Sequence, residues 1–376
     1  MSIGLIGANI TSNVLAQNIS RSNSVHLFET KNTKTNNQVR YDNLKIMIDT
    51  MERPRTIMTM ERDPDSKTTV HKLSKFLSPD DTIMECNENF SNTLGNERKC
   101  KRSGIHYLGV GVATGSVSEP SIMVGGDLGT FSTHSDLLKT VSPNVVYISE
   151  SPDSGHVTKI IHDAMESAMY QCLSDVFTYC NYNQTLFECM MYYAVQFSVN
   201  GNLLRNALSS SRKYDMCNNI SYDVPDTLLL CSEASLNCKL FTPVLNASTI
   251  SKIHCLHTFS KSVCNLETNK IKEETVAGAI LFIFACIILE GCDMLRAHDI
   301  SVERGVRAWK RGSAIECEML HLDCGEIEKI KMENVQHARR LLLGCISHER
   351  SVPLVSAAID AFDFQRCSGH SVNFKN

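Results

Sequence analysis

The stretch IGLIGANITSNVL, residues 3–15, decides the fold class, because an apolar run changes there through a glycine into a helix-like segment. A strand that turns into a helix in this way is the setting in which α/β proteins hold the phosphates of a dinucleotide. Gly7 supplies the turn, whereas Asn9 and Ser12 occupy positions where the G-x-G-x-x-G/A pattern has small residues. The turn predicts a nucleotide-binding domain in which Asn9 crowds a pyrophosphate. A related domain that has lost its nucleotide is the alternative.

Short apolar segments recur along the first part of the chain and are separated by more polar stretches. The strand candidates are residues 2–7, 25–29, 56–60, 82–85 and 105–110. Strands that alternate with helical segments predict a Rossmann-like domain with a parallel sheet, which we expect over residues 1–152. Glu29 ends the second candidate strand, where a carboxylate can accept a hydrogen bond from a ribose 2′-hydroxyl. A solvated charged loop is the alternative interpretation of Glu29.

The remainder of the chain, residues 153–376, has the pattern of an all-helical domain. Apolar residues recur at helical spacing between residues 155 and 179, which predicts one long helix. The longest apolar run, residues 276–289, is shorter than the roughly 20 residues that span a bilayer. We therefore expect this run to be a buried core helix and expect no membrane partner.

Charge and cysteine content narrow the class of protein further. The formal net charge is −4, so no broad basic field favours a nucleic-acid partner. Ser2–Gly7 begins a strand pattern directly, without the features of an export signal, which predicts a cytoplasmic protein. The sixteen cysteines are then expected to be reduced thiols.

The segment GHVTKIIHDAMES, residues 155–167, carries the most distinctive group of reactive side chains. Lys159, His162 and Glu166 are spaced three and four residues apart, which stacks them on one face of a helix. A lysine and a carboxylate that face one site can act as base and acid when their surroundings adjust their pKa values. An ordinary amphipathic helix with a solvated lysine and glutamate is the alternative, and the spacing alone favours it.

The same segment resembles the catalytic helix of the 6-phosphogluconate dehydrogenase family. By that resemblance Lys159 is the general base, Glu166 the general acid, and His162 a matching substrate-site residue. Asp163 stands where the family has an Asn that orients substrate and cofactor, and Ser167 stands where it has a Tyr. The charge of Asp163 is expected to oppose an anionic sugar acid.

Other segments carry the resemblance along nearly the whole chain. IHYLGVGVATG at 105–115 keeps glycines of the family, with Gly115 among its substrate-site positions. MECNENF at 84–90 places Asn87 on a family Asn that contacts substrate and cofactor, if one Gly is deleted. TPVLNASTISKIHCLH at 242–257 has His254 in place of a phosphate-binding Arg. VERGVRAWKRGSAIE and VPLVSAAIDAFDF resemble a tryptophan signature and the closing helix of the helical domain.

The resemblance implies a homodimer that oxidises and decarboxylates 6-phosphogluconate to ribulose 5-phosphate, a step of the pentose phosphate pathway, with NADP or NAD and without a metal. Asn9, Ser12 and Glu29 fall on its cofactor-binding positions, and Thr30 replaces the Arg that holds the NADP 2′-phosphate. Several phosphate ligands are missing, and the tail that reaches the partner subunit is not recognisable. We therefore expect a divergent, carboxyl-terminally shortened member with weakened or lost activity. The alternatives are a non-catalytic dimeric binding protein and a dehydrogenase for a smaller hydroxy acid without phosphate.

Overall fold

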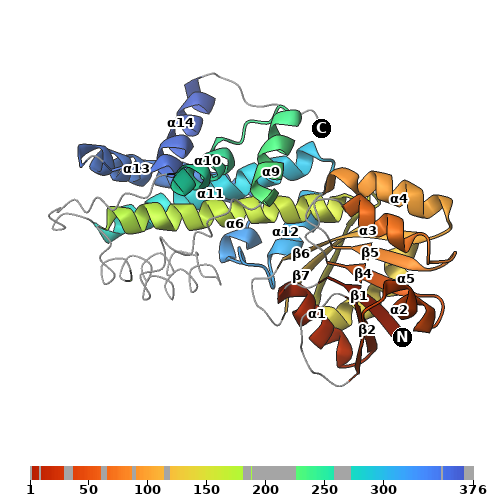
Figure 1. Cartoon of the computed structure of the whole chain (residues 1–376). Helices are drawn as coiled ribbons and strands as arrows, with labels where there is room; N and C mark the ends of the chain where they lie inside the picture. The colour runs from red at the N-terminus through yellow and green to blue at the C-terminus, as the bar shows by residue number, and fades with distance from the viewer. Residues whose placement is uncertain are drawn as a thin grey trace. The chain divides into compact units, whose positions relative to one another are not determined.

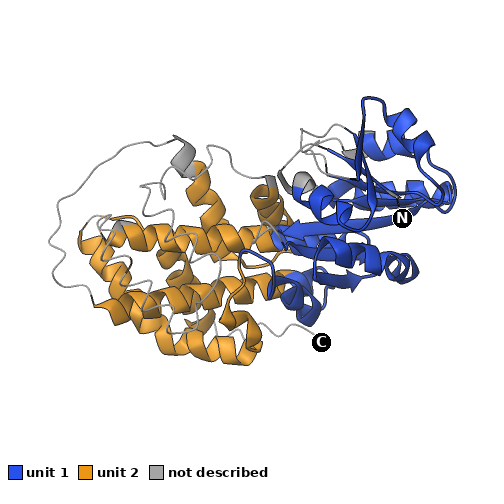
Figure 2. Ribbon diagram, turned by 90° about the horizontal axis from the view of Figure 1, so that it is seen from below, with its two compact units in different colours: residues 1–161, 295–314 blue, residues 162–294, 315–376 orange. Residues whose placement is uncertain are grey.

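The structure is a computed structural model, and it describes ten stretches of the 376-residue chain. These are residues 2–7, 10–28, 37–60, 66–86, 90–113, 119–180, 188, 226–257, 272–348 and 350–367. Two compact units divide the chain: residues 1–161 with 295–314, and residues 162–294 with 315–376 (Figure 2). Each unit is described by itself.

The first unit is built on one eight-stranded sheet (Figure 1). Its strands are β1 Ser2–Ile6, β2 Ser24–Phe28, β3 Gln38–Tyr41, β4 Thr56–Thr59, β5 Thr82–Glu85, β6 His106–Ala113, β7 Ser121–Gly126 and β8 Asn144–Ser149. They lie in the order β3-β2-β1-β4-β5-β6-β7-β8, and every neighbouring pair is parallel except β6 with β7. The order of the first six is that of a dinucleotide-binding sheet, with its switch point beside β1.

Helices cover both faces of this sheet. Successive residues of its strands point to opposite sides, and both sides carry apolar side chains that the helices bury. Ile3 and Leu5 of β1 are buried in one apolar cluster, and Ile6 is buried in the other. The helices of the unit are α1 Ile10–Ser20, α2 Leu44–Thr50, α3 Ser66–Leu73, α4 Thr93–Arg102, α5 Leu128–Val141 and α12 Val302–Trp309, together with the start of α6 Ser154–Tyr179. A short 3₁₀ turn, Phe90–Asn92, precedes α4. The expected α/β class is confirmed.

The second unit is helical in all of its described regular structure except a 3₁₀ turn at Glu318–His321. Its helices are α9 Asp226–Asn237, α10 Pro243–His257, α11 Glu273–Ala297, α13 Cys324–Ser347 and α14 Pro353–Cys367, with most of α6 Ser154–Tyr179. Helix α11 contains the predicted core run and is long and apolar enough to cross a membrane, yet 89% of that window is buried inside the protein. It is the core helix of the unit. Phe282 of α11 meets Phe362 of α14 edge to face.

The division between units differs from a single boundary at residue 152. Helix α6 begins in the first unit and continues into the second, since the units separate between Ile161 and His162. The segment with the tryptophan signature belongs to the first unit, where Ser121 Oγ and Asn144 Nδ2 both donate to the Ala308 carbonyl oxygen. Trp309 at the end of α12 is fully buried.

Candidate functional site

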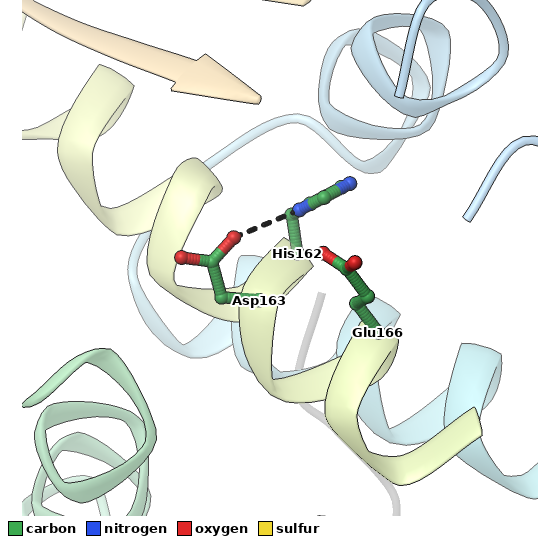
Figure 3. Close-up of side chains that lie close together, drawn as sticks. All are labelled: His162, Asp163 and Glu166. Atoms are coloured by element: carbon green, nitrogen blue, oxygen red, sulfur yellow. Dashed lines mark hydrogen bonds and ion pairs between the residues drawn. The ribbon is translucent and has the colours of Figure 1, made fainter. Parts of the chain in front are cut away.

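Helix α6 carries the residues that the sequence singles out. Lys159 and Glu166 are half-buried, and His162 is 1% exposed. Figure 3 shows the carboxylate of Glu166 turned toward the imidazole of His162, one helical turn away. The predicted spacing on one long helix is confirmed, although the roles of Lys159 and Glu166 stay predictions.

Glycines of β6 and β7 fix the start of α6 within the first unit. A Cβ atom on Gly111 would lie 2.3 Å from the Gly155 carbonyl oxygen and 2.6 Å from the Lys159 Cβ. A Cβ on Gly109 would lie 1.9 Å from the Pro152 carbonyl oxygen, and one on Gly125 would lie 2.5 Å from that of Ser151. Only glycine permits approaches this close. The strands therefore determine where the Lys159 side chain leaves the helix.

His156 provides a second anchor for this part of α6, and the sequence analysis missed it. Its Nδ1 lies 2.9 Å from Thr93 Oγ1, and its Nε2 lies 2.7 Å from the backbone oxygen of Glu85. Since only Nε2–H can donate to that carbonyl, Nδ1 accepts from Thr93. Burial lowers the pKa of His156, which favours this neutral form. The signal that could have identified His156 in the sequence is its position three residues before Lys159.

His162 is held by its neighbour in the sequence. Its Nδ1 donates to Asp163 Oδ1 at 3.0 Å, while Nε2 is buried and has no partner among the described residues (Figure 3). The Asp163 side chain is 17% exposed. A carboxylate on Nδ1–H fixes the tautomer and leaves the Nε2 lone pair as a hydrogen-bond acceptor.

Helix α10 faces the same part of α6 within the second unit. Ser167 Oγ of α6 and Ser248 Oγ of α10 lie 3.3 Å apart, and both residues are buried. Lys252 of α10 is half-buried; burial lowers the pKa of its ammonium group, while Glu166 and then Asp163 raise it. Lys252 thus lies within electrostatic range of both acidic side chains. The sequence analysis missed it, because no local pattern distinguishes it from a surface lysine.

Several predicted site positions lie outside the described residues: Asn9, Glu29, Asn87 and Gly115. The side chains of Ser12 in α1 and His254 in α10 lie outside them too. Gly7, which follows β1, has a φ of 114°, and its N–H donates to the Phe28 carbonyl oxygen at the end of β2. Its backbone conformation is one that favours glycine, as a tight strand-to-helix turn requires.

His162, Asp163 and Glu166 also have the spacing of metal ligands, with donor atoms within 4.8 Å of one another. The ammonium of Lys252 lies near the same two carboxylates and would be repelled by a divalent ion. The donor set therefore fits a cation poorly while Lys252 is charged, and we assign no metal to it.

Comparison with known proteins identifies the relatives of this chain. Residues 2–149 match the family described as the NAD binding domain of 6-phosphogluconate dehydrogenase. The decarboxylating 6-phosphogluconate dehydrogenase of Staphylococcus epidermidis is 27% identical over 195 residues, which cover 46% of this chain and 42% of that protein. The NAD(+)-dependent decarboxylating enzyme of Bacillus subtilis is 28% identical over 201 residues, covering 47% and 42%. The matched stretch therefore spans less than half the length of these curated relatives.

Solved structures extend the similarity of fold to the whole chain. The 6-phosphogluconate dehydrogenase of Plasmodium falciparum aligns with a TM-score of 0.82 at 16% identity, covering 100% of this chain and 93% of that one. The 3-hydroxyisobutyrate dehydrogenase of Mycobacterium tuberculosis aligns with a TM-score of 0.51 at 13% identity, covering 71% and 96%. Residues 2–149 therefore match the NAD-binding domain of 6-phosphogluconate dehydrogenase, and the chain as a whole has the fold of a solved 6-phosphogluconate dehydrogenase.

Proposed function

We propose that this protein is an NAD(P)-dependent dehydrogenase of hydroxy acids in which Lys159 is the base and Glu166 the acid, and that 6-phosphogluconate is at best a poor substrate. The observation that carries the proposal is the placement of α6, where Gly111 lies close to the Lys159 Cβ and where His162 and Glu166 follow on the same helix. A helix fixed by such contacts holds reacting groups in position, and correct positioning can supply a large part of the reduction in the activation barrier.

The nicotinamide, when bound, supplies the hydride acceptor. Lys159 takes the proton of the substrate hydroxyl as the carbon-bound hydrogen departs with its electron pair. For a substrate that then loses CO2, Glu166 returns a proton to the enediol carbon. His162, with Nδ1–H on Asp163, offers Nε2 to a substrate hydroxyl. Proton transfer of this kind contributes roughly 10²–10⁴-fold to rate.

For the cofactor, we propose NAD over NADP, with weak binding. The sequence supports this because Glu29 repels a 2′-phosphate but can accept from a free ribose hydroxyl, and Thr30 carries no charge to replace the family Arg. Calorimetric titration with both nucleotides tests the preference. NADP binding at low micromolar concentration and much tighter than NAD would contradict it.

We also propose a cytoplasmic homodimer. Large apolar side chains are exposed on α10, α13 and α14 of the second unit, and the rings of Phe241 and Phe364 lie 5.6 Å apart, tilted by 42°, although these residues are 51% and 64% exposed. Exposed apolar patches of this kind mark contact surfaces. Light scattering at micromolar concentration should give twice the chain mass, and a monomer mass would refute the dimer.

The catalytic proposal is tested by following nucleotide reduction with 6-phosphogluconate and with phosphate-free hydroxy acids, 3-hydroxyisobutyrate among them. Turnover of a phosphate-free acid, lost in Lys159→Ala, supports it, and turnover of 6-phosphogluconate should be far below the roughly 10 s⁻¹ of a median enzyme. No reduction of either nucleotide with any acid would favour the alternative, a non-catalytic binding protein. Fast turnover of 6-phosphogluconate would show that other residues replace the missing phosphate ligands.

A further inference from the structure

The carboxylate of Glu85 is buried at the carboxyl end of β5, inside the first unit. Glu85 is 0% exposed, and its two carboxylate oxygens accept from Asn96 Nδ2 of α4 at 3.3 and 3.1 Å. The Tyr107 hydroxyl of β6 donates to the same carboxylate. Burial and the neighbouring Glu85 raise the pKa of Tyr107, so its hydroxyl keeps the proton that it donates. A buried carboxylate with these partners holds β5, β6 and α4 together.

Glu85 also holds helix α6, through its backbone. The Glu85 carbonyl oxygen accepts from His156 Nε2 at 2.7 Å, and Thr93 Oγ1 of α4 lies 2.9 Å from His156 Nδ1. Thr93 and Asn96 are three residues apart and share a face of α4. The hydrogen bonds therefore close a ring that runs from Glu85 through α4 and His156 back to Glu85.

His156 and Lys159 lie over the same face of β6. Gly109 and Gly111 are two residues apart on that strand, so they face the same side of the sheet. A Cβ on Gly109 would lie 3.2 Å from His156 Cε1, and one on Gly111 would lie 2.6 Å from the Lys159 Cβ. Close steric approach limits the distance between strand and helix, whereas a directional hydrogen bond also fixes the rotation of the helix.

We propose that His156 is a positioning residue for Lys159. Its two hydrogen bonds, backed by the buried Glu85, keep the first turns of α6 in one rotation over β6. The inference rests on the proposed function for the chemical role of Lys159, but not for the placement of its side chain. It predicts that loss of the His156 hydrogen bonds releases Lys159 even though every glycine of β6 is kept.

The test is trace acetylation of the full chain with acetic anhydride at pH 8, followed at Lys159 by peptide mass spectrometry. Lys159 is half-buried, so release of α6 should expose its ammonium group and speed acetylation. His156→Leu loses both hydrogen bonds and should raise the rate about tenfold relative to the exposed Lys139 in the same sample. Thr93→Val loses one of them and should raise the rate about threefold, whereas Thr93→Ser keeps the hydroxyl and should behave as the wild type. An unchanged rate in His156→Leu, or in Thr93→Val if His156→Leu does not fold, would overturn the proposal.

His134→Leu is the matched control, because His134 is a buried histidine of the same unit with the same two kinds of partner. Its Nδ1 lies 2.8 Å from the Thr130 backbone oxygen, and its Nε2 lies 3.1 Å from Thr56 Oγ1. This variant should lower the urea midpoint as His156→Leu does, yet leave acetylation of Lys159 within about twofold of the wild type. An equal rise in both variants would mean a general loosening of the unit and would also overturn the proposal. Acetylation needs no substrate, so a protein that reduces no nucleotide would refute the proposed function while the rate at Lys159 still decides the role of His156.

Discussion

The first two turns of helix α6 and the turns that follow are positioned by different forces. Up to Lys159 the helix lies against glycines of β6 and β7, where no room remains for a side chain. From His162 onward its polar groups meet partners that differ in kind: a neighbouring carboxylate, a serine of α10 and the charge of Lys252. Lys159 is placed by steric exclusion, whereas the surroundings of Glu166 are set by charge.

This contrast matters for how such a site can diverge. A steric contact this close leaves no room for an added side chain, so substitution of these glycines would displace Lys159. A charge can be compensated by any oppositely charged residue that comes within range, as Lys252 does for the acidic side chains of α6. Substitution among the charged groups is therefore expected to be tolerated better than substitution of the glycines.

The largest effect is expected from Gly111→Ala, which disturbs only the contact between the glycines of β6 and β7 and the start of α6. The new Cβ would lie 2.3 Å from a backbone oxygen and 2.6 Å from the Lys159 Cβ, and backbone cannot move aside cheaply. We expect a loss of about 3 kcal/mol in the free energy of unfolding, together with displacement of Lys159. Urea unfolding measures the loss.

Gly95→Ala is the matched control for that substitution. Gly95 lies exposed in α4, and a Cβ there would meet nothing within 4 Å. Alanine should stabilise the helix by about 0.5–1 kcal/mol. If both alanine variants behaved alike, the close approach of β6 to α6 would not be what positions Lys159.

The sequence predicts most strands of the first unit, because their apolar patterns are local. Strand candidates at 2–7, 25–29, 56–60, 82–85 and 105–110 are confirmed by strands over nearly the same residues. The missed strands are β3, β7 and β8. Strand β3 has only four residues at the sheet edge, and β7 ends in two glycines, which weaken a strand pattern.

The surroundings of α6 from His162 onward could be predicted only in part. The shared helix face of Lys159, His162 and Glu166 follows from helical spacing, which is a property of one segment, whereas their proposed roles follow only from the family resemblance. Lys252 lies more than eighty residues further along the chain, and only the packing of α10 against α6 brings it into range. Such pairings depend on tertiary structure, which periodicity in one sequence does not encode.

The second effect, a change of about 2 kcal/mol in the free energy of unfolding between pH 6 and pH 8, is expected at Glu290. Glu290 anchors α10, the helix that carries Lys252. Burial raises its pKa to about 8, against the opposing effect of the Leu245 and Val244 N–H groups. The folded state then keeps a proton that the unfolded state releases at its ordinary, lower pKa, so stability falls as pH rises from 6 to 8. Glu290→Gln should remove that part of the pH dependence in urea unfolding. An unchanged slope in the variant would show that Glu290 is charged in the folded protein.

The smallest effect is expected at Asp175, further along α6. Its carboxylate oxygens accept from Gln171 Nε2 at 2.8 Å and from the Leu354 N–H at 3.3 Å, at the start of α14. Burial raises its pKa to about 7 despite these two donors, so the folded state holds a proton at pH 6 that the unfolded state has lost. From pH 6 to pH 8 this group should cost about 1 kcal/mol of stability. Asp175→Asn should flatten that part of the curve, since the new amide cannot titrate and Gln171 can turn its own oxygen toward it. Because Asp175 and Glu290 share no hydrogen-bond partner, their effects should add in the double variant. If the pH dependence of the double variant Asp175→Asn/Glu290→Gln differed from the sum of the two single effects, α14 and α10 would be coupled. The electrostatic coupling along α6 would then extend beyond Ser167.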